Sequence, residues 1–396
     1  MGLLGRILYL GRDWNFDGAE SQLFYLTGGL DKSQFDSVVL LDRAGPLTQK
    51  LIMHGRPVYH QRFSPWRSFP KAIFRYSDAW KALALAQRHN IDLVHASDLW
   101  RAPYALFISR RLRVPCVIHV RGPVLPHDIA KHRLAAADAI ISIADRYRND
   151  LINAGIPSNQ ISVIDDSVDL DRFNPTVTPA DIPCPETFTL SANTVLVGVL
   201  GRVEPFKRIL EFISVIAALP REVQAKAFYL IIGQPGPADY MREVQRAIDR
   251  HGLASRVILT GRSGDSAAIL ARLNILVTMS GGSIMFEAMA MSRAVLSIRP
   301  DGRHSVHTRD RETAICVTAT SAAPAGQALA ELIDNDTLRW QLGRAGRIWA
   351  QRHLSIDQMC RKTERLYAAL LNPSTTDTDM VVSSGAASQQ KMNNQG

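Results

Sequence analysis

The chain has 396 residues, a net charge of +9 and 46% hydrophobic residues, which is enough length and apolar content for two domains with cores of their own. The basic excess suits an anionic ligand, an anionic membrane surface or nucleic acid, and does not choose among them. The four cysteines are scattered and form no Cys-x-x-Cys pair, which argues against a disulfide framework or a structural zinc site and favours a reducing compartment.

The first ten residues are apolar, but Arg6 interrupts them, and Arg12 and Asp13 follow at once. The apolar run is therefore too short for a signal peptide or a transmembrane segment, and no other stretch is suited to span a bilayer. We expect a cytoplasmic protein in which residues 6–10 form the first strand of a sheet.

Short apolar runs alternate with helical patterns through the first half of the chain. A loop with two glycines, 11–20, follows the first strand, and a helical pattern then extends from 21 to 30. This alternation predicts a parallel, doubly wound α/β sheet. Further strands are predicted at 38–41, 57–60, 92–95, 115–119 and 139–143, and a basic helix is predicted at 71–89.

The composition changes around Pro175, where prolines fall among Thr, Ala and Asp. This change predicts a first domain over 1–175 and a linker over 176–194. A second alternating series then predicts strands at 195–200, 228–232, 257–260, 275–277, 294–298 and 314–317. We expect a second domain over 195–350, a C-terminal helix over 351–372 that returns to the first domain, and a disordered tail over 373–396.

Two similar sheets predict a ligand site in a cleft between facing halves, because such sheets bind ligands at the carboxyl ends of their strands. One candidate is the turn Gly281-Gly282, which links the predicted strand 275–277 to a run of good helix formers. Glycines let a ligand approach the backbone, and the start of a helix offers unpaired N–H groups. Glu287 lies about one turn into that helix, within reach of hydroxyl groups. The alternative is a tight strand-to-helix connection without a ligand.

A second candidate loop, 201–208, follows the first strand of the second domain. Gly201 ends that strand, and Arg202, Lys207 and Arg208 follow within one loop. An Arg offers a bidentate fork for phosphate and a Lys offers a point charge, so the loop predicts a diphosphate clamp. The alternative is a solvated basic loop. The spacing is not that of a phosphate-binding Walker A loop.

Histidines and carboxylates supply the remaining candidates. His119 ends a predicted strand of the first domain, which places it to contact a ligand, and His95 at another strand end competes with it. The segment Asp169-Leu-Asp171 resembles a metal-binding Asp-x-Asp motif, but its place at the domain boundary favours a cap or a turn. His304 and His307 lack a third ligand at a suitable spacing, so we predict no metal site.

Several motifs, in order along the chain, resemble those of the retaining glycosyltransferases of the GT-B fold, family four (glycosyl transferases group 1). Gly201-Arg-Val-Glu-Pro-Phe-Lys207 is similar to the Gly-Arg…Lys-Gly loop of that family, and Phe286-Glu287-Ala-Met-Ala to the end of its Glu-x7-Glu motif. Asp17-Gly18-Ala-Glu20 resembles its first-domain glycine loop, and Ile118-His119 lies where its active-site His is expected. Residues 137–175 resemble the segment that enters its second domain. The resemblance covers the chain up to about residue 371.

The resemblance implies transfer of a sugar, with retention, from a UDP- or GDP-linked donor to a glycan or a lipid-linked acceptor, in bacterial surface polysaccharide or glycoconjugate synthesis. It implies no bound metal, no cofactor besides the nucleotide-sugar co-substrate, and no nucleic acid partner. By the same resemblance, Arg202 and Lys207 would hold the donor diphosphate, Glu287 the ribose hydroxyls, and His119 the donor sugar. Backbone contacts to the donor would come from Gly18, Gly281, Gly282, Ser283 and Ile284.

Three positions depart from the family pattern. The first Glu of the Glu-x7-Glu motif falls at Met279, or at Ser280 if the loop is one residue shorter, and neither residue is acidic. The usual Lys-Gly is Lys207-Arg208, and the usual Asn-Gly before Val-Asp is Asp166-Ser167. Two alternatives therefore stay open: a non-catalytic nucleotide-sugar-binding protein, and a nucleotide-sugar epimerase of the same fold.

A basic segment, 67–88, contains the aromatic residues Phe69, Phe74 and Trp80 and follows directly after Trp66. This composition suits peripheral docking on anionic lipid at the inner membrane face, where a lipid-linked acceptor would lie. The alternative is a helix whose aromatic rings face the core and whose cations are solvated.

Overall fold

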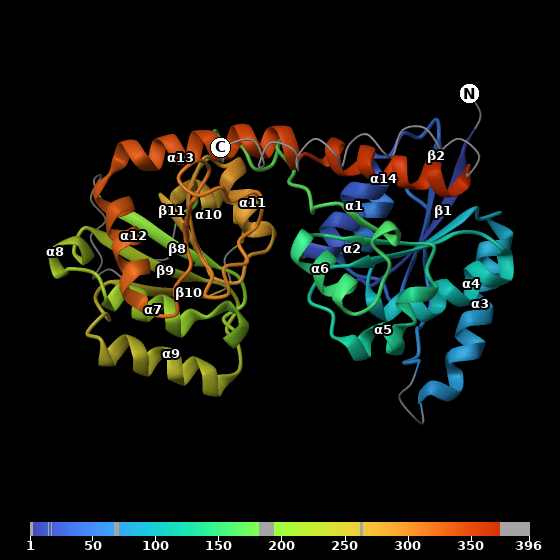
Figure 1. The fold of residues 1–396 in the computed structure, drawn as a ribbon, viewed down its shortest axis with the longest axis horizontal. Coiled ribbons are helices and arrows are strands. Elements are labelled where there is room, and N and C mark those ends of the chain that lie inside the picture. Colours follow the sequence, from blue (N-terminus) through green and yellow to red (C-terminus); the bar gives the residue numbers. More distant parts are fainter. Residues whose placement is uncertain are drawn as a thin grey trace, which may run out of the picture. The chain divides into compact units, whose positions relative to one another are not determined.

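The structure, a computed structural model, describes residues 3–14, 16, 18–66, 71–181, 194–261 and 264–372. The chain forms two compact units (Figure 1): the first combines the residues up to Asp165 with those from Met359 on, and the second is Asp166–Gln358. Each unit is a parallel sheet covered by helices, so the predicted pair of Rossmann-like α/β domains is confirmed. Much of the predicted linker and the whole predicted tail lie outside the described residues.

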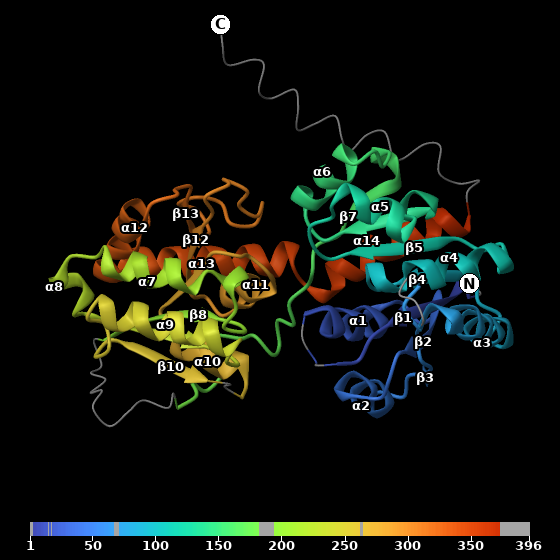
Figure 2. The same cartoon turned by 90° about the horizontal axis from the view of Figure 1, so that it is seen from below.

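Within its described residues, the first unit has a seven-stranded parallel sheet of order β3-β2-β1-β4-β5-β6-β7, which Figure 2 shows from β7 to β3. The strands are β1 (Gly5–Gly11), β2 (Phe35–Leu41), β3 (Val58–His60), β4 (Leu93–Ala96), β5 (Cys116–Val120), β6 (Ala139–Ser142) and β7 (Ile161–Val163). The helices are α1 (Gly18–Gly29), α2 (Pro46–Met53), α3 (Arg75–Arg88), α4 (Ala102–Leu112), α5 (Pro126–His132), α6 (Asp145–Asn153) and most of α14 (Ile356–Leu371).

Both faces of this sheet are buried, which is why its strands are continuous apolar runs. Leu8 and Leu10 of β1 point into one core cluster, whereas Tyr9 points to the opposite face. Helix α14 covers that opposite face, since the Tyr367 hydroxyl lies 3.1 Å from the Tyr9 hydroxyl and 2.5 Å from His95 Nδ1. Figure 1 shows α14 beside β1 and β2. The C-terminal helix is therefore part of the first unit.

The second unit has, among its described residues, a six-stranded parallel sheet of order β10-β9-β8-β11-β12-β13. Helices α7 and α9 pack on one face of this sheet, and α10 and α11 pack on the other (Figure 1). The strands are β8 (Val195–Leu200), β9 (Ala227–Ile232), β10 (Val257–Gly261), β11 (Ile275–Thr278), β12 (Ala294–Ile298) and β13 (Ile315–Val317). The helices are α7 (Ile209–Ala217), α8 (Arg221–Gln224), α9 (Ala238–Arg250), α10 (Ser266–Arg272), α11 (Ser283–Ala290), α12 (Ala322–Asp334) and α13 (Asp336–His353).

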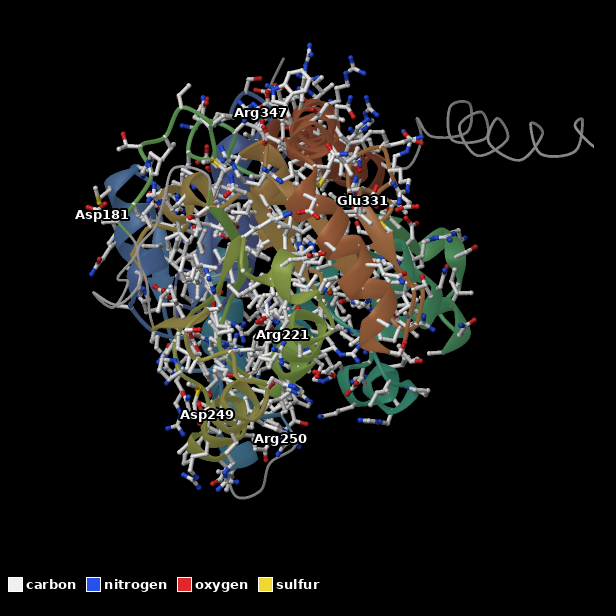
Figure 3. All side chains as sticks on the ribbon, turned by 90° about the vertical axis from the view of Figure 1, so that its left-hand side faces the viewer. Asp181, Arg221, Asp249, Arg250, Glu331 and Arg347 are labelled. Atoms are coloured by element: carbon white, nitrogen blue, oxygen red, sulfur yellow. The ribbon has the colours of Figure 1, made fainter. Side chains whose placement is uncertain are left out.

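Residues 166–175, which we predicted to end the first domain, contribute to the core of the second unit. Val168 and Phe173 are buried there, and the Val168 N–H donates to the carbonyl oxygen of Leu354 at 2.7 Å. Arg347, labelled in Figure 3, donates to the carbonyl oxygens of Phe173, at 3.1 Å, and of Ala290. Two apolar side chains and one cation thus hold this segment on the second unit.

Helix α2 and strand β7 of the first unit, like helix α6, were not predicted. Helix α2 follows Gly45 and has Pro46 in its first turn, a start signal that the sequence does contain. Strand β7 is a three-residue edge strand, too short to stand out as an apolar run. Helix α1 begins at Gly18, three residues before the predicted start at Ser21. Among the described residues, no helix combines the length and apolarity needed to cross a membrane.

Candidate functional site

The candidate residues of the second unit lie on loops that follow two neighbouring strands. Strand β11 pairs with β8 in parallel, with Ile275 opposite Val197. The loop 201–208 follows β8, and the turn 279–282 follows β11. Because parallel strands end at the same edge of a sheet, both segments emerge at one edge, where ligands of such sheets bind.

Glycines shape the first of these loops around Lys207, which ends a short 3₁₀ turn, η5 (Pro205–Lys207). Gly201 has a φ of +129°, and a Cβ atom there would lie 2.8 Å from Lys207 Cε. A Cβ atom on Gly233, at the end of β9, would lie 1.9 Å from the carbonyl oxygen of Gly201. Only glycine therefore allows the two strand ends to approach each other and leaves room for the Lys207 stem.

Arg202 and Lys207 occupy different environments within that loop. The Arg202 side chain is 58% exposed and pairs with Glu204 at 2.7 Å. Lys207 is half-buried, and burial lowers its pKa, with the Arg202 charge acting in the same direction and Glu204 and Glu287 opposing. The predicted clamp thus consists of an exposed guanidinium group, that of Arg202, and a half-buried ammonium group, that of Lys207.

The turn before α11 adopts a conformation that favours glycine at two successive positions. The φ angles of Gly281 and Gly282 are +72° and +102°, and the Gly281 N–H donates to Thr278 Oγ1 at 3.1 Å. Helix α11 then starts at Ser283, with Ile284 next. The first N–H groups of a helix have no intrahelical acceptor, so this turn presents donors at the edge of the sheet.

Glu287, in the second turn of α11, is half-buried among charges from other segments. Burial raises its pKa to about 7, while Arg172 and Lys207 lower it and Asp265 raises it further. Arg172 in turn donates to Asp265 Oδ1 at 2.9 Å. The structure therefore brings Lys207 and Glu287 together electrostatically, and adds the Arg172–Asp265 pair, which the sequence analysis did not identify.

The two candidate positions for the missing first Glu of the motif differ in burial. Met279 is 5% exposed and packs in the core cluster that also contains Val277, so its side chain points into the protein. Ser280 is half-buried, and its hydroxyl donates to the carbonyl oxygen of Gly281 at 3.4 Å. Of the two, Ser280 is the one outside the core.

The two competing histidines of the first unit lie against each other. His119, on β5, is 4% exposed, and its ring stacks on that of His95, on β4, with centroids 5.4 Å apart and an interplanar angle of 19°. Arg121 Nη2 lies 3.3 Å from His119 Nδ1. Burial lowers the pKa of both rings, that of His95 to about 3, and the Arg121 charge acts in the same direction.

Gly18 is the first residue of α1 and is exposed, and a Cβ atom there would meet no described atom within 4 Å. No packing contact therefore requires glycine at this position. The structure places Gly18 and His119 in the first unit and the other candidate residues in the second.

The remaining polar candidates have structural partners. Asp169 Oδ1 accepts from the N–H groups of Asp171 and Arg172 at 3.2 and 3.1 Å, which confirms the predicted turn. His304 lies between Ser297 Oγ, at 2.9 Å from Nδ1, and Thr318 Oγ1, at 3.2 Å from Nε2. In the part of the chain that the structure describes, no three His, Cys, Asp or Glu side chains cluster as metal ligands would.

Comparisons with known proteins cover both units. The sequence profile of Glycosyltransferase Family 4 matches residues 16–172, and that of Glycosyl transferases group 1 matches residues 194–335. A search of curated proteins finds no match.

Solved structures share the fold over most of the chain. One is Alr3699/HepE of Anabaena in complex with UDP and glucose, at 19% identity and a TM-score of 0.76, covering 92% of this chain and 100% of that one. A glycosyltransferase of Rickettsia africae ESF-5 has 16% identity and a TM-score of 0.78, covering 93% and 99%. The apo form of the lipopolysaccharide outer core galactosyltransferase WaaB has 15% identity and a TM-score of 0.68, covering 92% and 100%. The fold is GT-B, as expected.

Proposed function

The chain belongs to the family 4 glycosyltransferases (glycosyl transferases group 1), and on that premise we propose that it transfers a sugar from a nucleotide-linked donor to a glycan or lipid-linked acceptor. The donor is UDP- or GDP-linked, the transfer retains the anomeric configuration, and no metal takes part. The acceptor belongs to a bacterial surface polysaccharide or glycoconjugate. Two similar structures hold UDP, one of them with glucose, and a third is a lipopolysaccharide galactosyltransferase, which supports this choice.

The observation that carries the proposal is the gathering of Arg202, Lys207 and Glu287 at one sheet edge, next to the start of α11. In the proposed reaction, Arg202 and Lys207 bind the donor diphosphate and stabilise its charge as it leaves. Glu287 accepts hydrogen bonds from the ribose hydroxyls. The N–H groups from Gly281 to Ile284 meet the phosphates and the sugar.

In the first unit, His119 contacts the transferred sugar, and Gly18 leaves open space in which the start of α1 meets the diphosphate. Both roles follow from the family resemblance. Neither requires a metal ion, because the cations of the second unit carry the charge of the diphosphate.

Two exposed tryptophans support a glycan acceptor at the first unit. Trp14 follows β1 and Trp100 follows β4, which is the neighbouring strand, and the rings are 59% and 60% exposed. The Trp14 indole N–H donates to Asp42 at 3.1 Å, and Lys131 lies 4.9 Å from the Trp100 ring centre. Fixed, exposed aromatic faces beside cations suit the apolar face of a sugar ring that carries an acidic group.

A third element of the proposal is peripheral contact with anionic lipid through helix α3 and the turn before it. Phe74 and Trp80 are about half exposed there, so the alternative in which these rings face the core does not describe them. Trp66 does pack against the core, and Phe69 lies outside the described residues. Arg111 lies 4.8 Å from the Trp80 ring centre, which places a cation beside an exposed ring.

The test is product analysis with the purified chain, a panel of UDP- and GDP-sugars, and chelator present in half of the reactions. Slow release of the free sugar with its anomeric configuration retained, unchanged by chelator, is the expected result. Formation of an epimer would replace the proposal with an epimerase, and nucleotide binding without turnover of any donor would replace it with a binding protein.

A further inference from the structure

The contact between Arg121 and His119 fixes which nitrogen of the imidazole carries the proton. Arg121 Nη2 lies 3.3 Å from His119 Nδ1. A guanidinium group has only donors and stays protonated, so in this hydrogen bond Nδ1 must be the acceptor. The ring is then neutral, and its single proton is on Nε2.

The Nε2–H group that results has no hydrogen-bond partner among the residues that the structure describes. The Nε2 atom itself is buried, so solvent does not supply the missing acceptor. A buried N–H donor without an acceptor has lost its hydrogen bonds to water without replacement, which is destabilising. A ligand oxygen that accepts a hydrogen bond from Nε2–H would remove this destabilisation. The group is therefore suited to bind a ligand through a hydrogen-bond acceptor.

Side chains on the neighbouring elements hold this ring and Arg121 in place. His95 on β4 stacks on it, and the Tyr367 hydroxyl of α14 holds His95 through Nδ1 at 2.5 Å. Tyr9 on β1 in turn lies 3.1 Å from Tyr367. Arg121 itself is anchored, since its Nε donates to the carbonyl oxygen of Ser97 at 3.2 Å. The titratable and charged groups facing the site from these elements are thus two tyrosines, one histidine and one arginine.

We propose that Arg121 is a positioning residue that fixes His119 as a neutral Nε2–H donor, and that this donor binds an oxygen atom of the transferred sugar. The identity of the ligand rests on the proposed function, whereas the protonation of the ring rests on the Arg121 contact alone. A group that can only donate forms a hydrogen bond to a hydroxyl or carbonyl oxygen and none to an ammonium group, which has no acceptor. The contacted position of the sugar therefore carries oxygen, and donors that are deoxy or bear a charged amine at that position are poor substrates.

The first test is spectroscopic and needs no substrate. Side-chain ¹⁵N–¹H correlation spectra of histidine-labelled protein distinguish the two neutral tautomers and the charged ring, and the His119→Gln variant assigns the signals. We expect one protonated nitrogen, Nε2, throughout the range from about pH 5.5 to about pH 8.5. Arg121→Lys, which keeps a donor-only cation, should preserve this pattern. Arg121→Gln, whose amide can donate or accept, should allow Nδ1–H or a charged ring to appear.

The second test is kinetic and uses the donor that the wild-type protein turns over. Arg121→Gln should lower kcat roughly tenfold, the equivalent of one hydrogen bond, with a smaller change in KM, and should add a titration step to the pH profile. His119→Gln, which keeps an N–H donor near the Nε2 position, should retain more activity than His119→Ala. Arg365→Gln, which changes an exposed arginine of α14, is the matched control.

A wild-type ring that is charged or protonated on Nδ1 at neutral pH, or an Arg121→Gln ring with an unchanged spectrum, overturns the proposal. So does a variant with the altered spectrum and an unchanged kcat and pH profile. If the wild-type protein turns over no donor, the proposed function fails, and the spectrum still decides whether Arg121 fixes the ring.

Discussion

Arg202 and Lys207 would share one diphosphate, yet they approach it from different surroundings. Arg202 extends from the surface, and Lys207 lies half-buried over the space that Gly201 leaves. We expect Arg202→Ala and Lys207→Ala each to reduce kcat/KM for the donor by the equivalent of about 1.5–3 kcal/mol, because each removes a charge-assisted contact. Steady-state kinetics with the active donor measures this loss.

The control for both variants is Arg250→Ala, an exposed arginine at the end of α9 that is labelled in Figure 3. It carries the same charge and belongs to the same unit. Folding is checked by circular dichroism. Normal donor turnover in folded Arg202→Ala and Lys207→Ala proteins would show that the diphosphate binds elsewhere.

Glu287 gives nucleotide binding a pH dependence of predictable sign. Burial raises its pKa to about 7, so the carboxyl is neutral below that pH and ionised above it. The ionised form accepts hydrogen bonds from ribose hydroxyls with all of its lone pairs, and the neutral form does not. The affinity for UDP should therefore rise between about pH 6 and about pH 8, as measured by titration calorimetry.

The Glu287→Gln variant separates this effect from the ionisation of the nucleotide, which both proteins experience equally. The difference in binding free energy between the two proteins should grow with pH. A difference that is constant over this range would mean that Glu287 does not titrate where ribose binds.

Helix α14 supplies buried polar contacts to the first unit. Its Tyr367 hydroxyl serves both Tyr9 and His95 in a buried site. Tyr367→Phe leaves these groups without that partner, so we expect the free energy of unfolding to fall by about 1–3 kcal/mol in urea titrations. Tyr147→Phe, which removes a half-buried hydroxyl bonded to Arg146, should cost less, and equal losses would argue against a special role for the buried site.

Helix α3 is the element that we propose to contact anionic lipid. Trp80 is half exposed there, and a Trp side chain that enters an interface gains free energy in proportion to its buried area. Trp80→Ser should therefore reduce binding to anionic vesicles roughly tenfold in sedimentation assays. Trp340→Ser is the matched control, because Trp340 of α13 is also exposed and its ring centre lies 5.2 Å from the Arg344 guanidinium carbon. Equal binding of the wild-type chain to neutral and anionic vesicles at low salt would remove lipid from the proposal.

How far the sequence predicts the elements depends on where their contacts lie. Buried parallel strands show as apolar runs, so β8 and β12 were predicted with the bounds that they have. The Arg172–Asp265 pair could not be found in this way, because it joins residues 93 apart in the chain. The position of Met279 could have been predicted, since alternation along β11 places it on the same side as Val277.

In the whole molecule, the candidate residues are divided between the two units. Hydrogen exchange can measure ligand binding at each unit separately. Free UDP offers ribose and diphosphate groups to the second unit, so we expect UDP to slow exchange in 201–208 and 281–287. A nucleotide-sugar should add protection around His119. UDP protection that is confined to the first unit would contradict the assignment of the nucleotide site.

The GT-B architecture itself follows from the sequence, because each half carries its own alternation of strands and helices. The position of the boundary between the two units does not follow from the sequence. Composition points to the proline-rich stretch at Pro175, whereas Val168 and Phe173 have already joined the second core. Whether a residue packs in one core or the other depends on contacts with α13 and the residues after it. These contacts are distant in sequence, so no local sequence pattern predicts them.

Helix α14 also determines the order in which the protein can be completed during its synthesis. The first unit contains residues from both ends of the chain, with the whole second unit encoded between them. A nascent chain that has just passed Asp165 has all the described strands of the first sheet, β1 to β7, but lacks Tyr367, so the Tyr9 and His95 face stays uncovered. Translation of the second unit must finish before that face is closed. At roughly 5–20 residues per second, the ribosome exposes this face for about ten seconds or more, and chaperone capture would be expected in that interval.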